Sequence, residues 1–281
     1  MTKLNWNLLT KRRDSSTQGV PPGKESLAWV NNTVTLVTGN DDAVLVDTFL
    51  SEQHSRELVE WVVQSGKNLR TIYVTHAHGD HYFGLALLLE RFPAAKAIAA
   101  RPVAEAIKKQ IDPAFIKSFW EPRFPGQIPK TLAAPQAAVG DTFELEGEQL
   151  RIISLGHTDT SQTTALHIPS LELVISGDAV YNETHLYLAE CDAAARSEWL
   201  NALDIIDALE PKAVVVGHAI TNPDSSPRHI EATRRYIQDF NATLEKVPTA
   251  LDLYDAMLAL YPDRVNPGSL WGAAKVAKPA V

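Results

Sequence analysis

The chain has 281 residues, of which 45% are hydrophobic and 21% charged, and its formal net charge is −8. This length buries a sizeable core, and the acidic balance argues against a nucleic-acid partner, because Lys11-Arg12-Arg13 is too short to form a basic stripe. No apolar run approaches the roughly 20 residues of a membrane span, and residues 1–20 lack the apolar region of a secretory signal, so we expect a cytoplasmic protein without membrane contact.

The first half of the chain alternates strand-like and helix-like segments. Residues 1–25 are polar and turn-rich, and we expect them to lie over the surface. Strand-like runs at residues 33–38 and 43–48 flank the hairpin sequence Gly39-Asn40-Asp41-Asp42. Apolar spacing then predicts, in order, a helix over 51–65, a strand over 69–75, a helix over 82–92, a strand over 96–100 and a helix over 102–111. This order favours parallel crossovers in an α/β sheet.

Residues 112–135 break that regularity. Aromatic side chains, including Phe115, Phe119, Trp120 and Phe124, alternate with prolines in a segment too long for a simple connector. Two interpretations remain open: a lid or pocket wall, or an excursion that packs on the body of the protein.

The second half begins with hairpins and ends with helices. We predict strands over residues 142–145, 149–155, 163–168, 171–176 and 213–217, and helices over 192–209, 228–244 and 249–260. Residues 272–281 are expected to form a loose tail. No change of composition marks a linker, so we predict one domain over residues 1–281, built from two similar halves that each place helices outside a sheet.

The densest group of metal-ligand residue types is Thr75-His76-Ala77-His78-Gly79-Asp80-His81, at the end of the strand predicted over 69–75. Imidazole and carboxylate suit zinc, iron or manganese. Histidines at i and i+2 fit an extended strand end, where alternate side chains point the same way. The alternative is a polar loop in which Asp80 caps the next helix, but the density of the cluster favours a metal site.

Three further residues of this kind follow predicted strands, each directly after a glycine: His157, Asp178 and His218. Side chains at the ends of adjacent strands converge in one crevice of an α/β sheet. Alone, His157 or His218 would be interpreted as a structural histidine. Together with the first cluster, both are interpreted as metal ligands. Asp47, at the end of another strand, is expected to accept a hydrogen bond from the metal loop; the alternative is an aspartate that only ends the strand.

The pattern His76-x-His78-x-Asp80-His81, followed by His157, Asp178 and His218, resembles the metallo-β-lactamase superfamily over roughly residues 30–220. The resemblance implies an α/β (α+β) protein folded as a four-layer αββα sandwich, with a dinuclear site at one edge. It implies two divalent ions, zinc first and iron or manganese as alternatives, with a hydroxide between them as nucleophile and Asp80 orienting it. By position it assigns His76, His78 and His157 to the first ion, Asp80, His81 and His218 to the second, and Asp178 to a bridge.

Residues that differ between the branches of this superfamily indicate which branch the chain resembles most. Asp178 stands where one class of β-lactamases has cysteine, which points to the glyoxalase II and lactonase-like branches. Tyr181 is similar in position to a tyrosine of the acyl-homoserine lactone lactonases, which implies a catalytic phenol that supports the substrate carbonyl; the alternative is a ring packed beneath the loop. Substrate contacts are also expected at Phe83, Trp120 and His185, although Phe83 and His185 have packing roles as alternatives.

We therefore predict a dinuclear metal-dependent hydrolase that cleaves an ester or lactone of a small molecule. The alternative is a glyoxalase II-like thioesterase, for which Lys275 and Lys278 are the available basic residues near the C-terminus. A β-lactamase, a mononuclear iron dioxygenase and a non-catalytic metal-containing ligand sensor are less favoured. The sequence leaves the exact substrate and the oligomeric state open.

Overall fold

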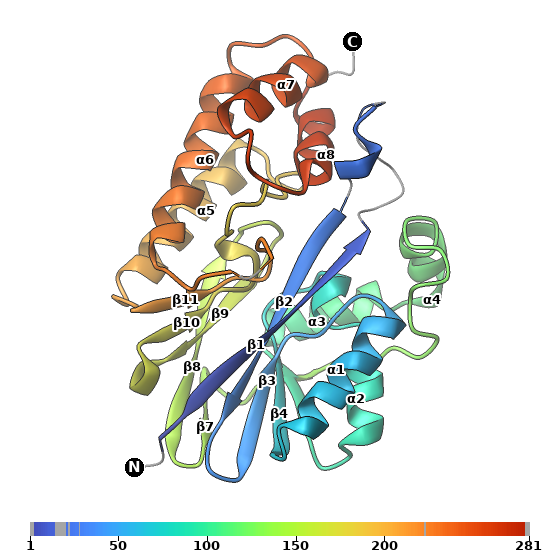
Figure 1. The fold of residues 1–281 in the computed structure, drawn as a ribbon, viewed down its shortest axis with the longest axis vertical. Coiled ribbons are helices and arrows are strands. Elements are labelled where there is room, and N and C mark those ends of the chain that lie inside the picture. Colours follow the sequence, from blue (N-terminus) through green and yellow to red (C-terminus); the bar gives the residue numbers. More distant parts are fainter. Residues whose placement is uncertain (1–2, 15–20, 22, 28, 222, 279–281) are drawn as a thin grey trace.

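In the computed structural model, residues 3–14, 21, 23–27, 29–221 and 223–278 are described, and two β-sheets pack face to face between two layers of helices (Figure 1). The first sheet has six strands in the order β1-β2-β3-β4-β5-β6, and the second has five in the order β11-β10-β9-β8-β7. The four-layer αββα sandwich expected from the sequence is confirmed.

The first sheet changes from antiparallel to parallel pairing at strand β3. Strands β1, β2 and β3 pair antiparallel, whereas β3, β4, β5 and β6 pair parallel through helical crossovers. Its strands are β1 (Asn5–Asp14), β2 (Trp29–Thr38), β3 (Asp42–Val46), β4 (Asn68–Val74), β5 (Lys96–Ala99) and β6 (Gln136–Ala137). Its helices are α1 (Glu52–Gln64), α2 (Leu85–Arg91), α3 (Arg101–Gln110) and the short α4 (Pro113–Phe115), which runs into a π-helical turn, Ile116–Trp120.

The second sheet is antiparallel except for its last pair, β10 and β11. Its strands are β7 (Thr142–Leu145), β8 (Glu148–Gly156), β9 (Thr163–Ile168), β10 (Leu173–Ile175) and β11 (Ala213–Val215). Its helices are α5 (Ala193–Asp207), α6 (Arg228–Leu244), α7 (Ala250–Leu260) and α8 (Pro267–Ala277), and single 3₁₀ turns lie at Glu25–Leu27, Gly79–His81, Pro169–Leu171 and Gly177–Ala179.

Three apolar clusters hold the four layers together. Between the sheets, Tyr73 and Val44 of the first sheet meet Leu166 and Ile175 of the second. The other two clusters lie between each sheet and its own helices. Since burying one such side chain stabilises the fold by about 1.5–3 kcal/mol, the sheets are fixed relative to each other, and so are the loops at their shared edge.

Both chain ends differ from the sequence expectation. Asn5–Asp14 forms a ten-residue strand along β2, from Asn5↔Thr38 to Asp14↔Trp29, in place of a surface segment of turns. In place of a loose tail over 272–281, helix α8 continues to Ala277 and buries Leu270 and Ala274; residues 279–281 lie outside the described part of the chain. None of the helices in the described part has the length and apolar character needed to cross a bilayer.

Candidate metal centre

Asp47 fixes the loop that follows strand β4 through hydrogen bonds to Thr75 and His81. Asp47 Oδ1 accepts a hydrogen bond from the Thr75 backbone N–H at 2.8 Å, and Oδ2 accepts one from Thr75 Oγ1 at 2.8 Å. The same Oδ2 lies 2.9 Å from His81 Nδ1, which donates because the carboxylate only accepts. This contact turns His81 Nε2 toward the site and confirms the expected role of Asp47 as an acceptor for the metal loop.

Two glycines permit the crowding around the site. Gly79 lies against the ring of Phe83, and Gly217 lies against Asp178 Oδ1, so a Cβ at either position would collide. Phe83 is fully buried and packs edge to face against Trp120, with ring centroids 5.0 Å apart. Of the two interpretations of Phe83, the structure therefore favours packing beneath the loop over contact with a substrate.

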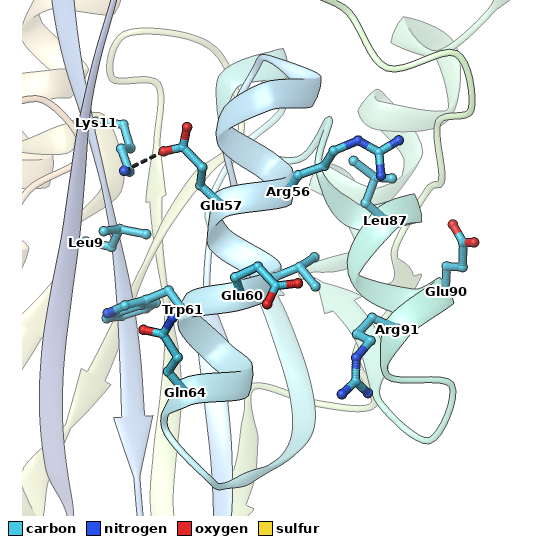
Figure 2. Close-up of a pocket in the computed structure, with 11 residues that line it drawn as sticks. Leu9, Lys11, Arg56, Glu57, Glu60, Trp61, Gln64, Leu87, Glu90 and Arg91 are labelled. Atoms are coloured by element: carbon cyan, nitrogen blue, oxygen red, sulfur yellow. Dashed lines mark ion pairs between the residues drawn. The ribbon is translucent and has the colours of Figure 1, made fainter.

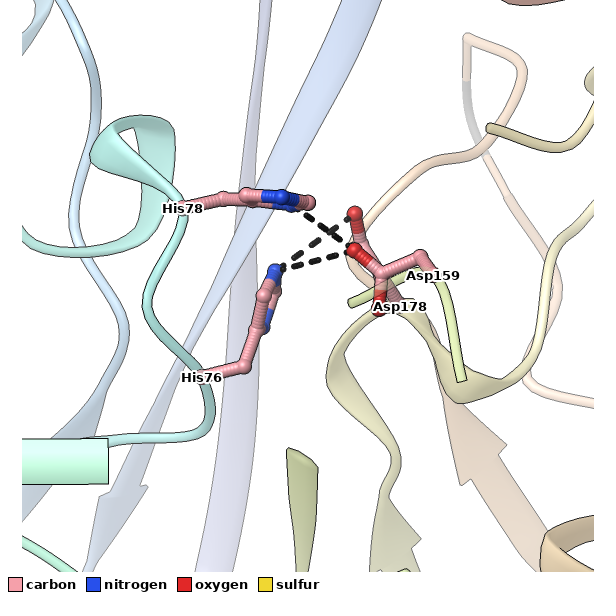
Figure 3. Close-up of side chains that lie close together, drawn as sticks. All are labelled: His76, His78, Asp159 and Asp178. Carbon is pink, nitrogen blue, oxygen red and sulfur yellow. Dashed lines mark ion pairs between the residues drawn. The ribbon is translucent and has the colours of Figure 1, made fainter. Parts of the chain in front are cut away.

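The first group of metal-ligand residue types comprises His76, His78, Asp159 and Asp178, whose ligand atoms lie within 4.8 Å of one another. Figure 3 shows the two histidines, from the loop after β4, pointing toward the two aspartates, which belong to loops of the other sheet. His78 Nδ1 lies 2.8 Å from Asp159 Oδ2, and His76 Nε2 lies 3.4 Å from the same oxygen. His76 Nε2 also lies 3.8 Å from Asp178 Oδ2.

Asp80, His81 and His218 form a second group on the same distance criterion. His218 Nε2 lies 3.5 Å from Asp80 Oδ2 and 2.9 Å from Asp178 Oδ2. His81 Nε2 lies 3.4 Å from Asp178 Oδ1. Asp178 therefore contacts both groups, as a carboxylate shared between two ions would.

Several atoms at the centre of these groups are buried without a hydrogen-bond partner among the described residues. They include His76 Nε2, His81 Nε2 and Asp178 Oδ1. Buried polar atoms nearly always have partners, and imidazole nitrogens and carboxylate oxygens are the donors that zinc, iron and manganese accept. The donor set and its unpaired atoms thus fit divalent metal ions.

The pKa values of these groups are strongly coupled. Burial lowers the pKa of His76, and the neighbouring His81 acts in the same direction. For His81, burial acts to lower the pKa, but the carboxylates of Asp178 and Asp80 outweigh it and raise the pKa well above its ordinary value. Burial likewise acts to raise the pKa of Asp178, but His218 and His81 hold it well below its ordinary value. An incoming cation would replace these protons, so binding of metal must release protons.

The structure brings Asp159, and not His157, into the first group. Strand β8 ends at Gly156 with a φ of 73°, and His157 Nε2 then turns to the backbone carbonyl of Glu190 at 3.1 Å. Asp159, two residues further along, is fully buried. Sequence reasoning missed it, although a carboxylate beside a candidate ligand was a visible signal. The resemblance assigns the ligand role in this loop to His157 and the geometry favours Asp159, so the metal content of variants at the two positions decides between them.

Tyr181 and His185, two expected substrate contacts, are both fully buried. The Tyr181 hydroxyl lies 3.5 Å from Asp178 Oδ2, and burial together with Asp178 raises the pKa of the phenol, which keeps it protonated. His185 Nδ1 lies 2.9 Å from the Tyr236 hydroxyl, and burial lowers the pKa of His185 to about 3. Tyr181 therefore reaches the site through Asp178, and His185 has a packing role.

A cavity of about 670 Å³ opens onto the two groups. Its lining includes His78, Asp80, Asp178 and His218, and also the aromatic side chains of Phe115, Phe119, Trp120 and Phe124. Residues 112–135 therefore contribute a pocket wall, one of the two interpretations of that segment. Its π-helical turn is a rare conformation that recurs at functional sites, and it directs Trp120 into the cavity.

A second groove lies away from the metal groups, between strand β1 and helices α1 and α2 (Figure 2). Its walls mix apolar and charged side chains, among them Trp61 and the ion pair of Lys11 with Glu57 at 2.5 Å. No group of potential metal ligands occurs there within the described residues, so the groove offers no comparable chemistry.

Comparison with known proteins agrees with this geometry. The family model described as the metallo-beta-lactamase superfamily matches residues 27–218. Two curated proteins match parts of the chain: the uncharacterized protein YobT of Bacillus subtilis (strain 168), 32% identical over 130 residues, and a hydroxyacylglutathione hydrolase of Parasynechococcus marenigrum (strain WH8102), 33% identical over 86 residues. These matches cover 46% and 31% of this chain, and only 54% and 30% of those proteins.

Solved structures share the fold at low identity. A metallo-beta-lactamase from Pontibacter korlensis superposes with a TM-score of 0.62 and 17% identity, over 84% of this chain and 99% of that one. A metallo-beta-lactamase family protein from Thermus thermophilus superposes with a TM-score of 0.65 and 19% identity, over 95% of this chain and 91% of that one. At these identities the likeness shows the fold alone.

Proposed function

Because the chain belongs to the metallo-β-lactamase superfamily, we propose that it is a metal-dependent hydrolase of a small ester or lactone, with two ions held by the two groups at the sheet edge. The observation that carries the proposal is the pair of buried groups, which share Asp178 and open into a cavity with aromatic walls. We place the first ion at His76, His78, Asp159 and Asp178, and the second at Asp80, His81 and His218.

When divalent ions are bound at these positions, they would supply a water activated for attack near neutral pH and a Lewis acid for the substrate carbonyl. The chain's own residues supply position and shape. Asp80 lines the cavity, and we assign to its carboxylate the role of orienting the nucleophile. The aromatic wall excludes water and binds the apolar part of the substrate, so that the carbonyl is held over the two groups.

The proposal is tested with purified protein reconstituted with zinc, iron or manganese and a panel of lactones and aryl esters. We expect saturable hydrolysis that is lost on chelation and restored by the metal. A His76→Gln variant, checked for folding by circular dichroism, serves as the control for contaminating esterases, because it removes a ligand of the first group. Absence of turnover of every lactone and ester by a protein with bound metal would contradict the proposal.

Tyr181 is proposed to act in the same reaction through its contact with Asp178. Tyr181→Phe removes only the hydroxyl, and we expect the rate to fall roughly 10- to 10²-fold, the usual cost of losing a hydrogen bond to a metal ligand. The measurement is kcat for the best ester, together with the metal content of the variant. An unchanged rate would contradict this role, and a loss of bound metal in parallel with the rate would show that the hydroxyl acts by holding Asp178 in place as a ligand.

A thioesterase activity is the second candidate. The match to a hydroxyacylglutathione hydrolase supports it, and Lys275, on helix α8, lies in the cavity wall, where it can meet an anionic substrate. Comparing S-lactoylglutathione with an oxygen ester of the same acid decides between the two. A kcat/KM higher for the thioester by more than about tenfold would favour the second candidate.

A further inference from the structure

A positively charged side chain, that of Arg13, reaches the metal centre from the edge strand β1 of the first sheet. Arg13, on β1, places Nη2 2.9 Å from Asp80 Oδ2. Both side chains are almost buried, with 11% of Arg13 and 9% of Asp80 exposed. An ion pair so shielded from solvent is screened far less by water and salt than a surface pair.

Asn32, on the neighbouring strand β2, locks this pair in place. Its Oδ1 accepts a hydrogen bond from Arg13 Nε at 3.0 Å, while its Nδ2 donates to Asp80 Oδ2 at 2.7 Å. Arg13 Nη1 donates to the backbone carbonyl of Asp14 at 3.0 Å. The guanidinium is therefore held at a fixed position beside the carboxylate.

The oxygen held by Arg13 is the same one that faces the second group of ligands. His218 Nε2 lies 3.5 Å and His81 Nε2 lies 3.9 Å from Asp80 Oδ2. An ion that binds Asp80 through Oδ2 shares that oxygen with the guanidinium or displaces it, and an ion that binds the other oxygen of the carboxylate still lies close to the guanidinium. Either way it meets the repulsion of a positive charge in a poorly solvated place.

In the described residues, no arginine or lysine forms an ion pair with the carboxylates of the first group. Its carboxylates, Asp159 and Asp178, form ion pairs only with histidines in the described structure, and histidines lose their protons when a metal binds. Asp178 contacts both groups. The difference therefore lies in the second carboxylate of each group: Asp159 pairs only with histidines among the described residues, whereas Asp80 is already paired with Arg13.

We propose that Arg13 makes the two metal sites unequal, so that the ions bind in order: the first group fills at low metal concentration and the second only at a higher one. The proposal rests on the part of the proposed function in which the two groups hold ions, and it does not require hydrolysis. Its consequence is a chain that carries one ion when metal is scarce and two when it is abundant.

The test is a titration of the metal-free full-length protein with Co²⁺, followed by visible absorption and by competition with a chromophoric chelator. We expect two steps, with the second dissociation constant at least about tenfold above the first. Arg13→Gln should tighten the second step about tenfold or more and leave the first unchanged. Arg13→Lys, which keeps the charge, should retain the gap.

Arg12→Gln is the matched control, because it removes the same charge from the adjacent position of the strand. Arg12 is exposed and stacks over Trp29, with its Cζ 4.0 Å from the ring centroid, so both steps should match the wild type. Equal steps in the wild type, or a second step that Arg13→Gln leaves unchanged or weakens, would overturn the inference. Two unequal steps without turnover of any ester would contradict the proposed hydrolase and leave the inference standing.

Discussion

Asp159 and His157 lie two residues apart, and only one of them faces the metal centre. Asp159 Oδ2 lies 2.8 Å from His78 Nδ1, whereas His157 Nε2 lies 3.1 Å from a backbone carbonyl. We expect Asp159→Asn, which keeps the shape and removes the charge, to weaken binding at the first site by more than about tenfold. His157→Ala should keep the wild-type metal content, measured by elemental analysis after gel filtration.

The opposite pattern would contradict this assignment. If His157→Ala lost an ion and Asp159→Asn kept it, the ligand would be the histidine that the family resemblance assigns. The loop after β8 would then have to turn on metal binding and bring His157 inward from Glu190.

His185 predicts a dependence of stability on pH. Its pKa is about 3 in the folded protein, because the side chain is buried, against about 6.5 in an unfolded chain. Below pH 6.5 the unfolded chain binds a proton that the folded chain does not, so stability falls as the pH falls, by about 1.4 kcal/mol per pH unit. Relative to His185→Gln, the wild type should lose about 2 kcal/mol of unfolding free energy between pH 7.5 and 5.0.

Urea unfolding of both metal-free proteins at each pH gives this difference directly. Between pH 7.5 and 8.5 the two proteins should change in parallel, since both values lie above the unfolded pKa. A difference that stays constant down to pH 5.0 would mean that His185 is accessible to protons in the folded state.

At the scale of elements, the π-helical turn Ile116–Trp120 should determine the affinity for apolar substrates. Trp120 lines the cavity, so Trp120→Leu removes apolar wall without touching a metal ligand. We expect KM for an aryl ester to rise about tenfold, the usual effect of a lost apolar contact, and kcat to change less than about threefold. Trp61→Leu, in the remote groove of Figure 2, is the control and should leave both constants unchanged.

A fall in kcat with an unchanged KM would contradict this role. It would show that the turn positions the metal loop through the contact of Trp120 with Phe83. Substrate binding would then depend on other parts of the cavity wall.

The sequence predicted the elements whose apolar periodicity is strong. Helix α6 and strands β7 and β9 have the predicted bounds, because a regular apolar face is visible locally. Strand β1 was missed, since its outer end carries Lys11, Arg12 and Arg13, and its stability comes from pairing with β2. Helix α8 was missed because its Ala- and Gly-rich sequence is weakly amphipathic and depends on packing against α7.

At the scale of the whole molecule, most of the site could be predicted from the sequence, because its residues follow predicted strands. Six of the seven predicted metal ligands meet in the two groups, because they follow strands whose ends share one edge of the sandwich. The spacing of residues in the sequence does not indicate whether His157 or Asp159, in the loop after β8, faces the metal centre. Nor could it place Arg13 beside Asp80, a contact between residues 67 positions apart.

The same geometry predicts that metal stabilises the whole fold. In the first group, His76 and His78 follow β4 of the first sheet, while Asp159 and Asp178 belong to the second. In the second group, Asp80 and His81 likewise face His218, which follows β11. Each ion would therefore link the two sheets, and unfolding would have to release it.

We expect the unfolding free energy to rise by about 1.4 kcal/mol for each tenfold increase in free Zn²⁺ above the dissociation constant of a site, and by twice that once both sites bind. Urea unfolding in zinc buffers, followed by circular dichroism, measures this slope. A His76→Gln, His218→Gln double variant removes one ligand from each group and should show almost no dependence on zinc. A wild-type protein whose unfolding midpoint ignored zinc would contradict the link between the sheets, because an ion released on unfolding must stabilise the folded state.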